Sequence, residues 1–179
     1  ILDYAHTPAA LESALSNLKE QFPFNKINLI FGCGGDRDFK KRSLMGKIAE
    51  KYSNEIYLTD DNPRNEKPFE IRNEIKKGIK NKRIHEIPDR KKAIREAVKN
   101  LKTGDILLVA GKGHEKIQDY GKKRTFFSDQ KVILSSIRAK NKFLSKNIKL
   151  NIIQEQSKLN LSKKIQIKDA SINSKLIKK

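Results

Sequence analysis

Residues 28–38 read Asn28-Leu29-Ile30-Phe31-Gly32-Cys33-Gly34-Gly35-Asp36-Arg37-Asp38. A short apolar run with polar residues on either side is typical of a strand that is buried on both faces of a parallel sheet. The glycines that follow allow a sharp turn and leave backbone N–H groups open to a phosphate or a carboxylate. Arg37 lies between two aspartates and offers a planar donor to an acidic group. The stretch therefore predicts a buried strand that leads into a ligand site.

Two familiar phosphate-binding loops do not fit this stretch. The dinucleotide fingerprint requires glycine at its first, third and sixth positions, and the sixth position counted from Gly32 is Arg37. The Walker loop ends in Gly-Lys-Ser or Gly-Lys-Thr, and the nearest approach to it is Gly111-Lys112-Gly113. Taken alone, the stretch also fits a plain strand-to-helix turn with solvated charges.

Strand-like and helix-like segments alternate along most of the chain. Apolar runs predict strands at residues 1–3, 26–31, 55–59, 83–87 and 106–110. Apolar residues at helical spacing predict helices at residues 8–22, 42–52, 68–79, 90–101 and 129–139. Thr7, Asp89 and Ser128 are suitable N-caps for three of these helices. This order predicts an α/β, Rossmann-like fold with a mainly parallel sheet and helices on both faces.

Four polar clusters follow predicted strands. They are residues 3–7, 32–38, 60–64 and 111–115. Ligands of an open α/β sheet bind at the carboxyl ends of its strands, and these clusters should meet there. We therefore expect a binding site at this edge of the sheet.

The net charge of +19 raises the possibility of nucleic-acid binding, but its distribution does not favour that function. Residues 138–179 hold twelve Lys and Arg against two acidic residues, so over half of the excess lies in this basic extension. Phe143 is its sole aromatic residue, whereas binding to single strands uses aromatic side chains that stack on bases. We expect no nucleic-acid partner.

Cysteine content and hydropathy indicate a cytoplasmic protein. The single cysteine, Cys33, excludes a disulfide within the chain and is expected to be a small apolar filler. No apolar run approaches membrane length and no signal peptide opens the chain, so no membrane partner is expected. The chain starts at Ile1 as if within a strand, which suggests a fragment of a longer protein.

The polar clusters, taken together, resemble the C-terminal domain of the Mur ligases. The motifs are Asp3-Tyr4-Ala5-His6-Thr7-Pro8, Gly34-Gly35-Asp36-Arg37-Asp38 with Lys41-Arg42, Asp61-Asn62-Pro63-Arg64 and Gly111-Lys112-Gly113-His114-Glu115. Their order and spacing match the family over residues 1–139, which are expected to form the substrate-closing domain. Residues 140–179 are then a basic extension or linker.

The resemblance implies an ATP-dependent acid–amino-acid ligase of peptidoglycan synthesis. Such an enzyme activates a D-glutamate carboxylate as an acyl phosphate, which the amine of the next amino acid attacks. In the family, upstream domains bind the UDP-sugar, contain the Walker loop and hold Mg²⁺, so ATP and Mg²⁺ sites should lie mostly outside this chain. The isolated chain is expected to be inactive, with no catalytic residue and no metal ligand of its own.

Residue roles follow by matching the motifs. The resemblance implies that Asp3 and His6 meet the nucleotide. It assigns the third amino acid of the stem peptide to Arg37, Asp61, Asn62, Pro63, Arg64, Gly111 and Glu115. Other interpretations remain: His6 and His114 could be ordinary loop histidines, and Asp61 and Asn62 could be turn formers before Pro63.

Within the family, residues 61–64 resemble the motif of members that add meso-diaminopimelate to UDP-MurNAc-L-Ala-D-Glu. Diaminopimelate has a second amino-acid head, whose carboxylate Arg64 can bind and whose ammonium Glu115 can accept. Lysine would place a cation near Arg64, which disfavours it. The alternatives are a lysine-adding or folylpolyglutamate-like ligase, or a non-catalytic Rossmann-type nucleotide-binding module.

The end of the chain suggests a fusion. Residues 149–153 and 165–167 alternate like strands. Residues 170–179 resemble the start of a Mur ligase N-terminal domain, with Asn173 and Lys175 as departures. We expect either a second ligase beyond Lys179 or a disordered extension rich in Lys, Asn and Ile.

Overall fold

The computed structural model describes residues 1–80, 84–149 and 154–155. The chain divides into two compact units, Ile1–Ile137 and Arg138–Lys179. In the second unit, residues 138–149 and 154–155 are helical. The expected domain division at residue 139 stays a prediction.

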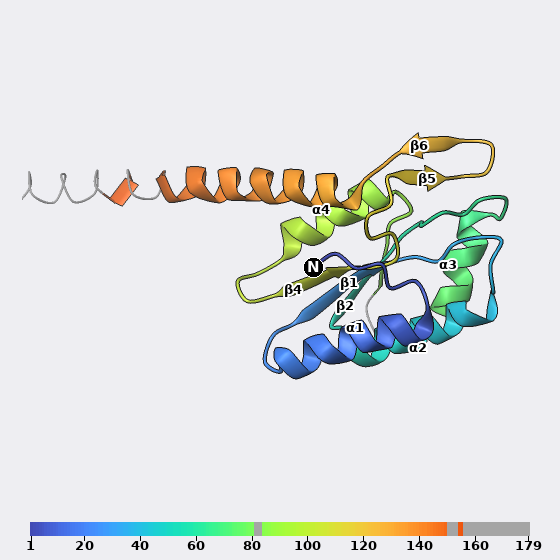
Figure 1. Ribbon diagram of the computed structural model, residues 1–179. Coiled ribbons are helices and arrows are strands. Elements are labelled where there is room, and N and C mark those ends of the chain that lie inside the picture. Colours follow the sequence, from blue (N-terminus) through green and yellow to red (C-terminus); the bar gives the residue numbers. More distant parts are fainter. Residues whose placement is uncertain (81–83, 150–153, 156–179) are drawn as a thin grey trace, which may run out of the picture. The chain divides into compact units, whose positions relative to one another are not determined.

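The first unit is built on a parallel sheet of four strands in the order β3-β2-β1-β4 (Figure 1). The strands are β1 (Ile27–Phe31), β2 (Glu55–Leu58), β3 (Ile84–Glu86) and β4 (Ile106–Val109). Central β1 is buried along its whole length, including Asn28, as expected of a strand that is covered on both faces. Leu2 forms a further parallel bridge to Val109. The predicted α/β fold with a parallel sheet is confirmed.

Helices cover both faces of this sheet (Figure 1). They are α1 (Pro8–Gln21), α2 (Lys40–Tyr52), α3 (Pro68–Lys76) and α4 (Arg90–Asn100). Leu29 of β1 packs in the core with α1, α2 and α3, whereas its neighbour Ile30 packs in a second core with α4. Adjacent side chains of a strand point to opposite faces, so β1 contributes to both cores.

The predicted N-caps are confirmed. The Thr7 side chain accepts from Ala10 N, and the Asp89 side chain accepts from Lys92 N. Ser128 Oγ accepts from Lys131 N at 3.4 Å. Each cap satisfies an N–H group that the first helical turn leaves without a partner.

A two-stranded antiparallel hairpin is present that the sequence did not predict. It consists of β5 (Ile117–Asp119) and β6 (Arg124–Phe126). Each strand has three residues and a charged or polar majority, so neither carries the apolar run on which strand prediction depends. The sequence does contain one signal for a hairpin turn, the glycine at position 121 between the two strands. Gly121 has φ 72°, which glycine adopts readily.

The last helix extends further than predicted, because residues 129–149 are all helical. This stretch contains neither glycine nor proline, so nothing in it stops a helix at residue 139. Lys149 is helical, which makes the strand prediction wrong at that residue. The predictions for residues 150–153, 165–167 and 170–179 lie outside the described residues. Of the helices described, none combines the length and apolar character that a membrane crossing requires.

Helices α2 and α3 approach so closely at Gly46 that we expect Gly46→Ala to destabilise the chain. A Cβ atom at Gly46 would lie 2.2 Å from the carbonyl oxygen of Ile75, which is backbone and cannot rotate away. Alanine favours a helix by about 1 kcal/mol over glycine, but overpacking costs about 1–3 kcal/mol. Urea denaturation should show a net loss of stability. Lys47→Ala, on the exposed next residue, is the matched control, and a stabilised Gly46→Ala variant would contradict the close approach.

Candidate functional site

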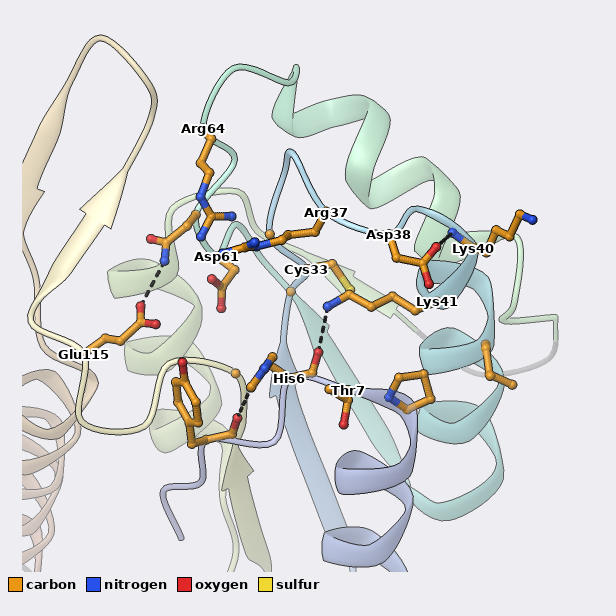
Figure 2. A pocket seen from close by; sticks show the side chains of 17 residues that line it. His6, Thr7, Cys33, Arg37, Asp38, Lys40, Lys41, Asp61, Arg64 and Glu115 are labelled. Carbon is orange, nitrogen blue, oxygen red and sulfur yellow. Dashed lines mark hydrogen bonds between the residues drawn. The ribbon is translucent and has the colours of Figure 1, made fainter.

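A cleft of about 630 Å³ lies at the carboxyl edge of the sheet (Figure 2). Its walls come from the N-terminal segment before α1 and from the loops that follow β1, β2 and β4. The N-terminal segment carries one of the four polar clusters and the three loops carry the others, and parallel strands bring all four together at one edge. The structure therefore has a cleft at the edge of the sheet where the sequence predicted a binding site.

Seven of the nine predicted site residues line this cleft. They are His6, Arg37, Asp61, Asn62, Arg64, Gly111 and Glu115. Pro63 is buried in the same loop but does not line the cleft. Asp3 does not line it either, and its Oδ1 accepts from Ala5 N at 2.7 Å, so its carboxylate shapes the turn before α1.

The glycine loop after β1 packs directly against the loop after β2. Gly35 N donates to the Asn62 carbonyl oxygen at 2.9 Å, and a Cβ at Gly35 would lie 1.8 Å from the Pro63 carbonyl oxygen. Only glycine fits such an approach between backbones. The sequence suggested that the N–H groups of this loop are open to a ligand. For Gly35 this is wrong, because its N–H bonds to Asn62 and so joins the two loops of the cleft.

Arg64 is held by backbone contacts on two sides. Its Nη1 donates to the Gly35 carbonyl oxygen at 2.7 Å, and its N–H donates to the Asp119 carbonyl oxygen in β5 at 3.0 Å. Its φ is 52°, a conformation that is rare for a bulky residue and is found where the surroundings impose it. Figure 2 shows the Arg64 and Arg37 side chains reaching toward the same part of the cleft, beside Asp61.

Asp61 forms an acidic floor to the cleft and is 8% exposed. Burial raises the pKa of its carboxyl, and the positive charges of Arg90 and Lys112 oppose that shift. Gly111 has φ 109°, and a Cβ there would lie 2.7 Å from Asp61 Oδ2. A glycine at this position keeps the carboxylate next to the backbone of the loop after β4.

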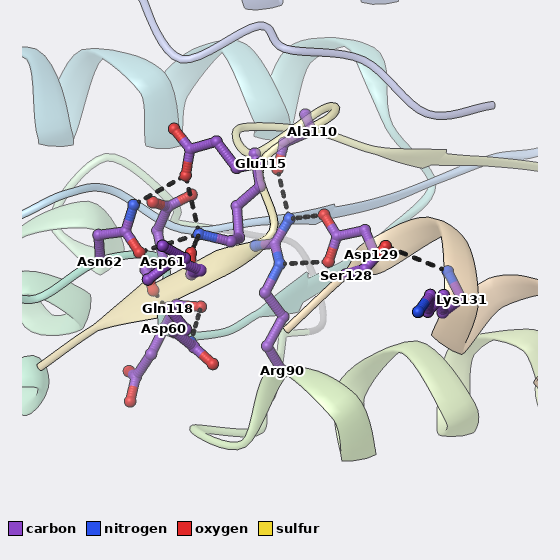
Figure 3. A network of polar contacts seen from close by, with 12 residues as sticks. Asp60, Asp61, Asn62, Arg90, Ala110, Glu115, Gln118, Ser128, Asp129 and Lys131 are labelled. Carbon is purple, nitrogen blue, oxygen red and sulfur yellow. Dashed lines mark hydrogen bonds and ion pairs between the residues drawn. The ribbon is translucent and has the colours of Figure 1, made fainter. Parts of the chain in front are cut away.

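Asn62 and Glu115 are joined across the cleft wall by a direct hydrogen bond (Figure 3). Asn62 Nδ2 donates to Glu115 Oε2 at 2.9 Å, and Lys112 Nζ donates to the same oxygen at 2.9 Å. Partial burial acts to raise the pKa of the Glu115 carboxyl, but the bonds from Lys112 and Asn62 outweigh it and lower the pKa. Glu115 is therefore a carboxylate at neutral pH.

Arg42 supports the glycine loop, a role that the sequence did not reveal. Its guanidinium binds the Glu66 carboxylate through two bonds of 2.8 Å and donates to Glu74 at 2.7 Å. It also donates to the Gly34 carbonyl oxygen at 3.1 Å. The hydrogen bond from Arg42 lowers the pKa of Glu66. The sequence does contain a signal for this role. Arg42 lies three residues before Met45 and therefore on the same, buried face of α2, and a buried arginine needs partners for its charge.

Arg90 and Asp129 form a fully buried ion pair behind the cleft (Figure 3). Two bonds, of 2.7 and 2.8 Å, join the guanidinium to the carboxylate. Arg90 Nη2 also donates to the Ala110 carbonyl oxygen at 2.9 Å, one residue before Gly111. The pair thus connects α4 and the start of the last helix to the loop after β4.

Aromatic rings gather at the N-terminal side of the cleft. The Tyr4 ring lies 4.6 Å from the His6 ring and 5.5 Å from the His114 ring, between centroids. Lys41 Nζ donates to the His6 carbonyl oxygen at 2.9 Å, which joins α2 to this segment. His85, to which the sequence assigned no role, lies elsewhere and stacks on Tyr57.

Cys33 lines the cleft but is not a nucleophile. Its Sγ lies 3.6 Å from Met45 Sδ in the core. Burial raises the pKa of this thiol to about 12, so the thiolate is absent at neutral pH. Its role as an apolar filler agrees with the sequence-based expectation.

Residues 1–113 match the family described as Mur ligase, glutamate ligase domain. A Rickettsia montanensis protein named UDP-N-acetylmuramoyl-L-alanyl-D-glutamate–2,6-diaminopimelate ligase is 51% identical over 138 residues, which cover 76% of this chain and 29% of that protein. A protein of the same name from Buchnera aphidicola subsp. Baizongia pistaciae is 52% identical over 142 residues, covering 79% of this chain and 28% of that protein.

A solved structure described as UDP-N-acetylmuramoyl-L-alanyl-D-glutamate–2,6-diaminopimelate ligase is similar in fold. It superposes with a TM-score of 0.74 at 44% identity and covers 78% of this chain and 29% of that one. The chain therefore spans under a third of the length of these relatives. With a match over more than half of its residues and with the cleft at the expected sheet edge, this chain belongs to the Mur ligase family.

Proposed function

We propose that this chain is the part of a cytoplasmic, ATP-dependent ligase that binds meso-diaminopimelate for addition to UDP-MurNAc-L-Ala-D-Glu during peptidoglycan synthesis. The observation that carries the proposal is that one cleft holds side chains of opposite charge, Arg64 and Glu115. Asn62, in the same loop as Arg64, donates a hydrogen bond to Glu115 and so connects the two. The names of the similar proteins support it. UDP-MurNAc-dipeptide, meso-diaminopimelate and ATP are the proposed substrates.

The charges of the cleft suit a ligand with two amino-acid heads. Arg37 and Arg64 offer guanidinium groups to carboxylates, and Asp61 and Glu115 offer carboxylates to ammonium groups. Meso-diaminopimelate carries two carboxylates and two ammonium groups, so each charge of the ligand finds an opposite charge. Lysine has one carboxylate and would leave an arginine without an anion.

The nucleotide is proposed to approach the N-terminal side of the cleft. The Tyr4 and His6 rings offer apolar faces there, and Lys41 supplies a cation next to the His6 backbone. Among the described residues, no group of three or more His, Cys, Asp and Glu side chains could hold a metal ion.

The proposed contribution of the chain to catalysis is orientation. The remainder of the protein supplies the acyl phosphate on the D-glutamate carboxylate. The residues of this cleft bind the heads of the incoming amino acid so that one amine, once deprotonated, faces the acyl carbon. Holding a nucleophile in this way converts an encounter in solution into a reaction within one complex.

Substrate selection in the complete protein tests this function. Phosphate release from ATP should depend on UDP-MurNAc-dipeptide together with meso-diaminopimelate. The kcat/KM for meso-diaminopimelate should exceed that for L-lysine by roughly a hundredfold, because lysine leaves charged groups of the cleft unpaired. Equal use of lysine, or release that is independent of any amino acid, would contradict the proposal.

A further inference from the structure

Lys112 is a buried lysine whose three N–H donors are all in use. Its side chain is fully buried. Nζ donates to Asn62 Oδ1 at 2.9 Å, to Glu115 Oε2 at 2.9 Å and to the Ile117 carbonyl oxygen at 2.7 Å. A lysine ammonium has three donors, so none remains for a ligand. Any effect of Lys112 on a ligand must therefore pass through the residues that it contacts.

The ammonium of Lys112 determines which way the Asn62 amide faces. Asn62 Oδ1 accepts from Lys112 Nζ and from Asp119 N at 3.0 Å. A flipped amide would turn its NH₂ group toward these two donors and lose both bonds. One N–H of Asn62 Nδ2 donates to Glu115, and the other has no partner among the described residues. Since Asn62 lines the cleft, this N–H is available to a carboxylate.

Lys112 also determines which oxygen of Glu115 is available. Oε2 accepts from both Lys112 and Asn62, whereas Oε1 accepts no hydrogen bond within the described part of the chain. The Glu115 side chain is 32% exposed, so one end of the ion pair is buried and the other meets the cleft. The free oxygen is suited to an ammonium group.

Other charged groups line the two pockets that Glu115 also lines or interact with its charge from nearby elements. They are Asp61 and Arg64 after β2, Arg90 of α4, His114 and Lys116 of its own loop, Asp119 and Arg124 of the β5–β6 hairpin, and the cleft residues His6, Arg37, Asp38, Lys40 and Lys41. Among the described residues, only Lys112 and Asn62 donate hydrogen bonds to Glu115. Removal of Lys112 should therefore change the protonation of Glu115 more than removal of a surface charge does.

We propose that Lys112 is a positioning residue, which presents the free oxygen of Glu115 to an ammonium group and the free N–H of Asn62 to a carboxylate of one amino-acid head. This inference rests on the proposed function, because it concerns recognition of the same amino acid. It adds a residue that contacts no substrate and acts through two that do.

The test is Lys112→Met in the complete protein, since methionine has a similar length and suits a buried position. The KM for meso-diaminopimelate should rise roughly tenfold or more, while the KM for ATP stays unchanged. The acid limb of kcat/KM for meso-diaminopimelate should move to higher pH, because a Glu115 without Lys112 is protonated more readily. Lys102→Met, at an exposed lysine before β4, is the matched control and should change neither quantity.

A double variant separates positioning from a general loss of stability. In a Glu115→Gln background, Lys112→Met should change the KM for meso-diaminopimelate by much less than it does alone, because both changes remove the same charged contact. The proposal would be overturned if the double variant raised the KM by the product of the two single fold-changes. An unchanged KM and acid limb in Lys112→Met would overturn it as well. If Lys112→Met does not fold, Lys112→Gln removes the charge, keeps two donors and should shift the acid limb in the same direction.

A titration without substrate distinguishes this inference from the proposed function. Carboxyl ¹³C resonances of the complete protein, with Glu115 assigned from its loss in Glu115→Gln, report the pKa of Glu115 directly. A higher pKa in the Lys112 variant supports the positioning role even if meso-diaminopimelate is not the substrate. An unchanged pKa overturns the role even if meso-diaminopimelate is turned over.

Discussion

Replacing Arg64 with alanine in the complete protein should raise the KM for meso-diaminopimelate by about thirtyfold to several thousandfold. Truncating one partner of a partly buried, charge-assisted contact costs about 2–5 kcal/mol, and each 1.4 kcal/mol is about tenfold. The KM for ATP should change little, because Arg64 lies after β2 and the proposed nucleotide contacts lie near His6. Steady-state kinetics with each substrate varied in turn make the comparison.

The controls for Arg64 separate a bound carboxylate from a general effect of charge. Arg124→Ala removes the same charge from the rim of the site, where the side chain is 72% exposed, and should have a small effect. Arg64→Lys keeps the charge but loses the planar fork, so it should give an intermediate KM. Since alanine is also disfavoured at φ 52°, Arg64→Ala leaves the backbone strain in place. An unchanged KM for meso-diaminopimelate would exclude Arg64 from the site.

Asp129→Ala should produce the largest loss of stability among the single substitutions considered for this chain. It leaves the guanidinium of Arg90 without its anion in a site where both side chains are fully buried. Breaking a buried ion pair by removing one partner costs about 3–5 kcal/mol, because the remaining charge has lost its water as well. Urea denaturation followed by circular dichroism would measure the change.

The matched control for Asp129 is an exposed ion pair. Glu70 pairs with Lys67 at 3.2 Å on the surface of α3, where the two side chains are 58% and 81% exposed. Glu70→Ala should cost less than about 1 kcal/mol, since exposed pairs contribute little. Equal losses for Asp129→Ala and Glu70→Ala would show that the buried pair is not a main source of stability.

The parts of the fold that the sequence predicted are those with a strong local signal. Strands β1 and β4 can be predicted from their own buried apolar residues, without knowledge of what they contact. Thr7 and Asp89 cap their helices through N–H groups that lie three residues away. The β5–β6 hairpin was missed because its three-residue strands contain no apolar run, and Gly121 between them indicates only a turn.

The site was predicted less completely than the fold, for a related reason. Arg37, Asp61, Arg64 and Glu115 line a cleft at the predicted edge of the sheet, and their contacts with the third amino acid stay a prediction. Asp3 accepts a hydrogen bond from Ala5 N within its own turn, and its contact with the nucleotide stays a prediction. Arg42 and Arg90 support the loops from within the core, although arginine is usually a surface residue.

The sequence by itself determined the alternation of strands and helices, because burial and capping act over a few neighbouring residues. It also placed four polar clusters after strands, and parallel pairing is enough to bring those to one edge. Only the tertiary structure decided which charged side chains line the cleft and which hold other residues in place. Lys41 lines the cleft, whereas Lys112 is buried among acceptors that include Asn62, fifty residues away in the chain. The physical reason is that a buried ammonium needs an acceptor for each of its donors, and those acceptors come together only when the loops pack.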